Sequence, residues 1–314
     1  MPDKAWVSFC ISTYKRPEIL RKQLELLSKQ TFPLFEVVIS DNDPGASARE
    51  VVNQMNDERF RYWHNGENLG MIKSFNKSIE RAGTDFIVMV TDDDPVQPDF
   101  LEKFYKLHLE YPDYSIYCGF LRKGKSESQV EIILSNEFLT EVLDPGKTTN
   151  ILWSSSVIRR EDAVSIGLIP DYGSPHLADH AFLALVGTVK GGIVINKMYS
   201  SLFSHDTNYS KSNLINYVNG CKGFYHWTLD RFSTNPEFVT YKKTALKHLE
   251  NWFLANFFGL RKYYVKNGEQ KEKISELDSC AKEIMSLEYM RGVRVKYSLK
   301  KILFRIKRIF RLLK

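Results

Sequence analysis

The sequence has few cysteines and no long hydrophobic run. Its 314 residues contain four scattered cysteines, with no CxxC pair and no histidine at metal-ligand spacing: Cys10, Cys118, Cys221 and Cys280. This pattern excludes a disulfide framework and a cysteine-rich zinc site and indicates reduced thiols in a cytosolic compartment. No segment reaches the roughly 18 apolar residues of a membrane-spanning helix, and we expect no signal peptide. We therefore expect a cytoplasmic protein.

Acidic residues are absent from the end of the chain. Residues 291–314 carry ten Lys and Arg and no Asp or Glu, whereas the other 290 residues have a net charge of −4. Apolar residues within this tail recur on one helical face, at 299, 302, 303, 306, 309, 310 and 313. A basic amphipathic helix is typical of an anionic membrane interface. The alternatives are a helix packed on the domain and a nucleic-acid-binding stripe. The acidic body and the lack of a nucleic-acid-binding motif lead us to expect no nucleic acid partner.

The first hundred residues alternate between strand-like and helix-like segments. Short apolar runs with strand character lie at 7–12, 36–40, 60–63 and 86–90. This alternation predicts an α/β fold with a mostly parallel sheet, whose ligands bind at the carboxyl ends of the strands. Residues 113–210 mix strands and helices, including a predicted strand at 151–158. From about 212 the pattern is helical, with breaks near Pro236, Gly268 and Gly292.

Three aspartates directly follow the apolar run at 86–90. Adjacent carboxylates repel one another, so burying them is costly unless a cation offsets the charge. If the strand alternation continues, Asp92 and Asp94 point to one side and Asp93 to the other. Two carboxylates on one side, together with substrate phosphates, commonly bind Mg²⁺ or Mn²⁺. A solvated acidic turn ended by Pro95 is the alternative, and the position after a buried strand favours the metal site.

Five segments, in order, resemble motifs of the family 2 glycosyltransferases. They are residues 12–17 ("TYNRP", with Lys15 for Asn), 38–42 ("VVSDN"), 68–76 ("NxGmxxNxN"), 91–98 ("DDDxxxP") and 154–161 ("SSxVxRRE"). The resemblance covers roughly residues 5–210. It implies a GT-A fold, a Rossmann-like mixed sheet that binds nucleotide sugars, in residues 1–210. Residues 1–100 would bind the nucleotide sugar, 113–210 the acceptor, and 211–314 would form a C-terminal helical region.

The resemblance also implies donor and metal contacts. The residues expected at the nucleotide sugar are Thr13, Arg16, Asp41, Lys73, Asp92 and Asp93. Asp41 would accept a hydrogen bond from the uracil N–H. An Asp41 that binds local backbone donors and a solvated Lys73 remain the alternatives. Asp92 and Asp94 would hold the Mn²⁺ or Mg²⁺ ion, with His205 from a segment similar to "YRxHxxNxS" that lacks the arginine.

In that family an acidic pair at the start of a helix supplies the catalytic base. Asp179 occupies this place, with Ala178 where the first acid usually stands. A first-turn acid favoured by the helix dipole is the alternative for Asp179. Asp171 and His180 are the next candidates. Trp153 could form an apolar wall for the acceptor sugar or belong to the core.

The leading interpretation is an inverting glycosyltransferase, peripheral at the inner face of the plasma membrane. It would move a sugar from a UDP-sugar or other nucleotide sugar to a hydroxyl of a lipid-linked glycan, in bacterial surface polysaccharide biosynthesis (O-antigen, capsule or similar). A metal-dependent nucleotidyltransferase is one alternative, although residues 12–17 contain no glycine for a phosphate loop. A catalytically inactive membrane-docking module is the other, because Ala178 replaces an acid.

Overall fold

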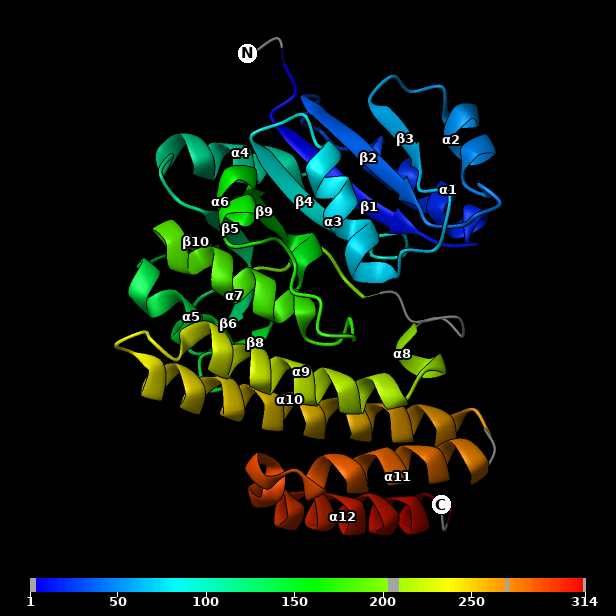
Figure 1. Cartoon of the computed structure of the whole chain (residues 1–314), viewed down its shortest axis with the longest axis vertical. Coiled ribbons are helices and arrows are strands. Elements are labelled where there is room, and N and C mark those ends of the chain that lie inside the picture. The colour runs from blue at the N-terminus through cyan, green and yellow to red at the C-terminus, as the bar shows by residue number, and fades with distance from the viewer. Residues whose placement is uncertain (1–3, 203–208, 269–270, 313–314) are drawn as a thin grey trace. The chain divides into compact units, whose positions relative to one another are not determined.

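The structure, a computed structural model, describes residues 4–202, 209–268 and 271–312 (Figure 1). The chain divides into two compact units. The first, the sheet unit, comprises residues 1–171 and 177–205, and the second, the helical unit, comprises 172–176 and 206–314. The division falls near the predicted boundary at 210, but a short segment from the middle of the chain joins the helical unit.

An eight-stranded mixed sheet forms the centre of the sheet unit. Its strands lie in the order β3 (Phe60–His64), β2 (Phe35–Asp41), β1 (Val7–Thr13), β4 (Phe86–Thr91), β9 (Ser156–Arg159), β5 (Ile116–Gly119), β10 (Gly192–Ile195) and β7 (Val130–Ile133). The first four strands are parallel, β9 is antiparallel to both of its neighbours, and β7 is antiparallel to β10. Strands β6 (Leu121–Arg122) and β8 (Thr148–Asn150) form a small second sheet. The predicted α/β class is confirmed.

Helices cover both faces of the parallel strands because side chains alternate along each strand. Val7, Phe9 and Ile11 of β1 join an apolar core with helices α1 (Pro17–Leu27), α2 (Arg49–Met55) and α4 (Phe100–Glu110). The other face of β1 meets α3 (Met71–Arg81), where Ser12 Oγ donates to Ser74 Oγ at 2.8 Å. Figure 1 shows α3 across the front of these strands.

The strand order reverses at β1. From β1 the chain moves to β2 and β3 on one side, and β4 then pairs with the opposite edge of β1. Ser12 of β1 lies in register with Thr91 of β4, so both strands end at the same level. Ligands of open α/β sheets bind in the crevice beyond the strand ends at such a reversal. The residues that follow Thr13 and Thr91 therefore meet where a ligand would bind.

The second half of the sheet unit differs from the prediction at 151–158. The elements there are α5 (Ser135–Leu143), the 3₁₀ turn η1 (Trp153–Ser155), α6 (Arg160–Ser165) and α7 (Ala178–Lys190). The predicted strand is shorter, because η1 occupies residues 153–155 and β9 begins only at Ser156. Trp153 packs edge-on against Phe75 of α3, with ring centroids 4.7 Å apart. The apolar pattern of residues 151–158 does not reveal this contact with α3, which is made from the 3₁₀ turn.

The helical unit consists of α8 (Tyr209–Ser212), α9 (Ile215–Phe232), α10 (Phe238–Lys266), α11 (Lys271–Ser286), the 3₁₀ segment η2 (Glu288–Val293) and α12 (Arg294–Leu312). Figure 1 shows α9 beside α10 and α11 beside α12. The predicted breaks near Pro236 and Gly268 follow α9 and α10, and Gly292 lies in η2 just before α12. Among the described residues, no helix is both long and apolar enough to span a membrane.

Two helical glycines should respond oppositely to alanine. A Cβ on Gly187 of α7 would lie 2.0 Å from Phe138 of α5, so the rings must shift, whereas a Cβ on Gly259 of α10 meets nothing within 4 Å. We expect Gly187→Ala to lower the free energy of unfolding by about 1–3 kcal/mol. Gly259→Ala should raise it by up to about 1 kcal/mol. Urea unfolding followed by circular dichroism measures both, and equal effects would contradict the close packing of α7 on α5.

Candidate active site

A buried ionic cluster lies at the ends of β1 and β4. Arg16, in the loop after β1, places Nη2 2.6 Å from Asp92 Oδ1 and Nη1 3.1 Å from Asp93 Oδ2. Thr13, the last residue of β1, donates from Oγ1 to Asp92 Oδ2 at 2.9 Å. The Asp92 side chain is fully buried. One arginine and one threonine from β1 therefore hold two aspartates that follow β4.

The three aspartates do not continue the strand alternation. Strand β4 ends at Thr91 and the chain turns at residues 92–93, so the side chains no longer point to alternate sides. Asp92 and Asp93 converge on Arg16, while the nearly buried Asp94 carboxylate accepts a hydrogen bond from Ser154 Oγ at 3.3 Å. The expectation that Asp93 points away from Asp92 is therefore wrong. The assignments of Asp92 and Asp94 as metal ligands stay predictions.

Burial makes both Asp92 and Asp94 hard to ionise. Loss of solvent raises the pKa of Asp92 to about 7, an effect that Asp93 adds to and that Arg16 and Thr13 oppose. Loss of solvent likewise raises the pKa of Asp94 to about 7, with smaller contributions from the charges of Asp93 and Asp179. A bound cation would favour both ionised forms. When both carboxylates are ionised, the cluster therefore carries more negative charge than the cation of Arg16 balances.

Oxygen ligands at this cluster fit a divalent cation. Mg²⁺ sites often use one or two carboxylates and complete their ligand sphere with water and substrate phosphates. Apart from its ion pair with Arg16 at 2.6 Å, the buried Asp92 Oδ1 accepts no hydrogen bond within the described chain, and Asp94 adds a second buried carboxylate. Across the described ranges, no group of three or more Asp, Glu, His or Cys side chains is arranged to hold a metal. The predicted third ligand, His205, lies outside the described residues.

Asp41, at the end of β2, is held by local donors. Its Oδ1 accepts from the Asp43 N–H at 3.0 Å, and its Oδ2 accepts from the Ala48 N–H at 3.1 Å and from Tyr62 Oη at 2.8 Å. The side chain is fully buried. Asp41 thus binds local donors, as the alternative interpretation expected. A hydrogen bond from a uracil N–H stays a prediction, and it would have to use the remaining lone-pair position.

The predicted glycine turn leads into α3. Asn42 links β2 to this turn, since its Nδ2 donates to Asn68 Oδ1 at 2.7 Å and its Oδ1 accepts from the Leu69 N–H at 2.9 Å. Gly70 has φ = +81°, a left-handed conformation that favours glycine. Lys73 lies exposed in the first turn of α3. Its contact with a donor phosphate stays a prediction.

Asp179 stands in the first turn of α7 and shares an electrostatic environment with the aspartate cluster. Its negative charge contributes to the raised pKa of Asp94. Its side chain is 29% exposed, and His180 Nε2 lies 3.8 Å from its Oδ2. Leu177, the residue just before α7, has φ = +66°, an uncommon conformation for leucine. Strained positions of this kind concentrate at functional sites.

Several contacts in the site were not predicted. Ser154 Oγ lies 2.9 Å from Ser200 Oγ as well as reaching Asp94, and Gln23 Nε2 of α1 donates to the Asp94 carbonyl at 2.8 Å. The serine run at 154–156, directly after Trp153, was the signal for Ser154. Trp153 itself is buried, as expected of a core residue. His176 belongs to the helical unit, where it stacks on Tyr217 with centroids 4.1 Å apart.

Comparison with known families decides the class of this site. The model of glycosyl transferase family 2 matches residues 8–166, about half of the chain. The chain belongs to this family. The match includes the ends of β1 and β4, with Arg16 and the three aspartates. The chain is thus a member of a glycosyltransferase family, as the motif resemblance predicted.

Known relatives agree with the family. The uncharacterized glycosyltransferase MJ1057 of Methanocaldococcus jannaschii is 33% identical over 108 residues, which are 33% of this chain and 37% of that protein. The GalNAc(5)-diNAcBac-PP-undecaprenol beta-1,3-glucosyltransferase of Campylobacter jejuni is 26% identical over 91 residues, 28% of this chain and 29% of that protein. The match spans less than half the length of these curated relatives.

The fold agrees with solved glycosyltransferases. The crystal structure of S. aureus TarS 1-349 in complex with UDP-GlcNAc superimposes with a TM-score of 0.61, covering 89% of this chain and 80% of that chain at 15% identity. The mixed sheet followed by C-terminal helices is therefore the GT-A fold that the motifs predicted.

The raised pKa values of Asp92 and Asp94 predict how the stability of the protein depends on pH. The prediction applies to protein from which a chelator has removed metal. Between about pH 4, the usual range of an unfolded aspartate, and about pH 7, the folded state binds more protons than the unfolded state. The free energy of unfolding should therefore fall as the pH rises through this window. We expect Asp94→Asn to flatten the fall and to stabilise the protein at pH 8 by about 2–4 kcal/mol. Urea titrations across the window measure this, with the exposed Asp113→Asn as control. A variant as pH-dependent as wild type contradicts the prediction.

Proposed function

We propose that the protein is an inverting glycosyltransferase that moves a sugar from a UDP-sugar or other nucleotide sugar to a hydroxyl of a lipid-linked glycan. The observation that carries this proposal is the aspartate cluster at the ends of β1 and β4, where Arg16 pairs with Asp92 and Asp93 at the point where the strand order reverses. A transferase needs a charged centre for the leaving diphosphate and a base for the attacking hydroxyl. The aspartate cluster would serve as the first, and Asp179, at the start of α7, as the second.

The donor nucleotide would occupy the crevice beyond β1 and β4. Thr13 and Arg16 already contact Asp92 there, at the point where the strand order reverses. Arg16 is 24% exposed, so part of its guanidinium can reach a ligand while the rest holds the aspartates. Such a planar cation binds phosphate oxygens in two parallel hydrogen bonds. We assign Arg16 to the diphosphate and Asp93, its second partner, to the same donor site.

A Mn²⁺ or Mg²⁺ ion would be held by Asp94 and Asp92 at the donor diphosphate. When bound, the ion supplies positive charge that stabilises the nucleoside diphosphate as it leaves. Asp94 and Asp92 would both be ionised in that state. Ser154 would keep the Asp94 carboxylate oriented through its hydrogen bond at 3.3 Å.

Asp179 would act as the general base. Its carboxylate takes the proton from the acceptor hydroxyl, whose oxygen forms a bond to the anomeric carbon as the bond from that carbon to the phosphate oxygen breaks. The nucleoside diphosphate leaves with the electron pair, on the face opposite the attack, so the configuration inverts. Asp179 is partly exposed, which suits a base that must receive a substrate from solvent.

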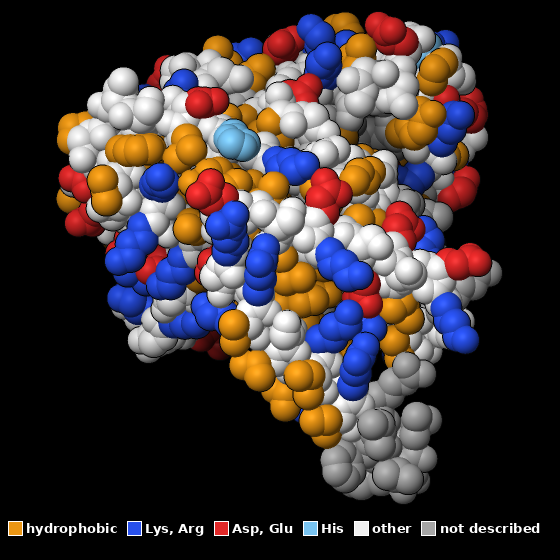
Figure 2. Space-filling model, turned by 60° about the horizontal axis from the view of Figure 1, so that its bottom comes forward, with side chains coloured by type: hydrophobic (Ala, Val, Ile, Leu, Met, Phe, Trp, Pro, Cys, Tyr) orange, Lys and Arg blue, Asp and Glu red, His pale blue; other side chains and the backbone are white. Residues whose placement is uncertain are grey.

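An acceptor on a lipid would bring the enzyme to a membrane surface, and α12 provides the means. Its apolar residues Val295, Leu299, Ile302, Leu303 and Ile306 are between 42% and 68% exposed. Figure 2 shows a row of hydrophobic side chains flanked by Lys and Arg at this end of the molecule. This face is not packed on the rest of the helical unit. The C. jejuni relative is named for a glycan acceptor on PP-undecaprenol, which supports the same class of acceptor for this chain. We place its role in bacterial surface polysaccharide biosynthesis.

Removing the Asp94 carboxylate should abolish metal-dependent donor binding. A panel of nucleotide sugars, with and without Mn²⁺, is screened by thermal unfolding, because a ligand that binds only the folded state raises its stability. We expect one UDP-sugar to stabilise the wild type by about 2–3 kcal/mol at a hundredfold excess over its dissociation constant, and only with metal. Asp94→Ala should lose this gain relative to its own unliganded baseline, while the exposed Asp171→Ala keeps it. If the UDP-sugar still stabilises Asp94→Ala in a metal-dependent way, Asp94 is not a metal ligand.

Replacing Asp179 by asparagine should separate catalysis from binding. Asn keeps the shape and hydrogen bonds of the side chain but cannot take the proton, so turnover should fall about 10²–10⁴-fold. Donor and metal binding should remain at wild-type levels. Asp171→Asn and His180→Gln test the two alternative bases under the same conditions. If Asp179→Asn keeps turnover within a few-fold of wild type and one of the other two variants loses most of it, that other residue is the base.

A further inference from the structure

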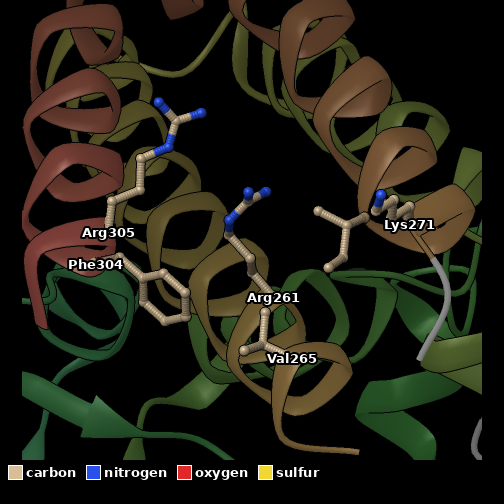
Figure 3. Close-up of a pocket in the computed structure, with 6 residues that line it drawn as sticks. Arg261, Val265, Lys271, Phe304 and Arg305 are labelled. Atoms are coloured by element: carbon tan, nitrogen blue, oxygen red, sulfur yellow. The ribbon is translucent and has the colours of Figure 1, made fainter. Parts of the chain in front are cut away.

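A second cavity, far in sequence from the proposed active-site residues, lies within the helical unit. It has a volume of about 280 Å³ and lies between α10, α11 and α12. Six residues line it: Arg261, Val265, Lys271, Ile274, Phe304 and Arg305. Figure 3 shows Arg261, Lys271 and Arg305 around the same cavity, each from a different helix. Three cations that line a single small cavity repel one another unless an anion joins them.

The protein supplies too little negative charge near this cavity. Asp278 of α11 is 2.6 Å from Arg261 Nη1 and 3.0 Å from Lys301 Nζ, so one carboxylate serves two cations. Neither Lys271 nor Arg305 forms an ion pair within the described part of the chain. Arg261 Nε is buried without a hydrogen-bond partner among the described residues. The cavity thus retains uncompensated positive charge and an unused donor.

The rest of the lining is apolar and adjoins the exposed face of α12. Val265, Ile274 and Phe304 contribute hydrocarbon surface to the same cavity. Phe304 and Arg305 directly follow Ile302 and Leu303, which are 53% and 55% exposed. Guanidinium groups bind phosphate with two parallel hydrogen bonds. A ligand that suits the whole lining therefore has a phosphate group attached to a hydrocarbon portion.

We propose that this cavity binds the phosphate headgroup of an anionic membrane lipid and so anchors α12 at the bilayer. The proposal rests on the membrane-docking part of the proposed function and names the chemical group that is recognised. Arg261, Lys271 and Arg305 contact the phosphate, and Val265, Ile274 and Phe304 contact the glycerol and first methylenes. The exposed apolar residues of α12 enter the same interface, so that headgroup binding and insertion occur together.

The test compares vesicles of equal measured zeta potential, made of phosphatidylcholine with either phosphatidic acid or the carboxylate lipid oleate. The full-length protein should bind the phosphatidic acid vesicles at least about tenfold more tightly in a sedimentation assay, since only they offer a phosphomonoester. Lys271→Gln/Arg305→Gln should abolish this preference. The matched control, Lys282→Gln/Lys307→Gln, removes two exposed charges from the same two helices but none from the cavity. It should keep the preference and lose at most about fivefold in affinity per charge on either vesicle.

Three results overturn the proposal, and each is distinct. A cavity variant that keeps the preference, as the control does, shows that these cations do not recognise phosphate. Wild-type protein that binds both vesicles equally shows that α12 responds to charge alone. In the third result, inorganic phosphate raises the melting temperature of the wild type but not of the cavity variant, and the wild type does not bind vesicles. That result identifies a site for free phosphate. Metal-dependent donor binding, measured on the same preparations, reports separately on the transferase assignment and should be equal in all variants.

Discussion

The candidate active site depends on one arginine that holds a buried and a half-buried aspartate. Asp92 is fully buried after a central strand, and it contacts the hydroxyl of Thr13, at the end of β1, and the guanidinium of Arg16, in the loop that follows. Removing one partner of a buried ion pair leaves an uncompensated charge, which costs several kcal/mol. The ends of β1 and β4 are therefore fixed relative to each other by charge as well as by backbone pairing. This leaves Asp94, the third aspartate, with Ser154 as a partner and with Asp179 as an electrostatic neighbour.

The parallel half of the sheet could be predicted from sequence because its signals are local. The apolar runs at 7–12, 36–40 and 86–90 became β1, β2 and β4 with ends within about a residue, since each strand is buried on both faces. Pro17 in the first turn likewise marked the start of α1. The carboxyl ends of these strands carry most of the predicted donor residues. Motif order then identified the family, which the match over 8–166 confirms.

Other parts of the structure could not be predicted because distant contacts decide them. The turn at 92–93 brings Asp92 and Asp93 to Arg16, and no local pattern specifies that pairing across 76 and 77 residues of chain. The assignment of residues 172–176 to the helical unit depends on contacts such as the Ser174 hydroxyl with the Asn216 carbonyl at 2.8 Å. Periodicity showed that α12 is amphipathic but could not show whether its apolar face is covered. In the structure, Tyr297 is buried while Leu299 and Ile302 are exposed.

The antiparallel strand β9 has a consequence for how this enzyme can evolve. It pairs with β4 on one edge, at Phe86 with Arg159, and with β5 on the other, at Ile116 with Ile158. The turn that precedes it carries Ser154, which contacts Asp94. One short segment thus joins the two halves of the sheet and touches the aspartate cluster. Recombination between relatives that exchanges the second half of the sheet unit would have to place its crossovers outside residues 153–159. Such a chimera would keep Ser154 and β9 together, so that the contact with Asp94 and the pairing with β4 come from one parent.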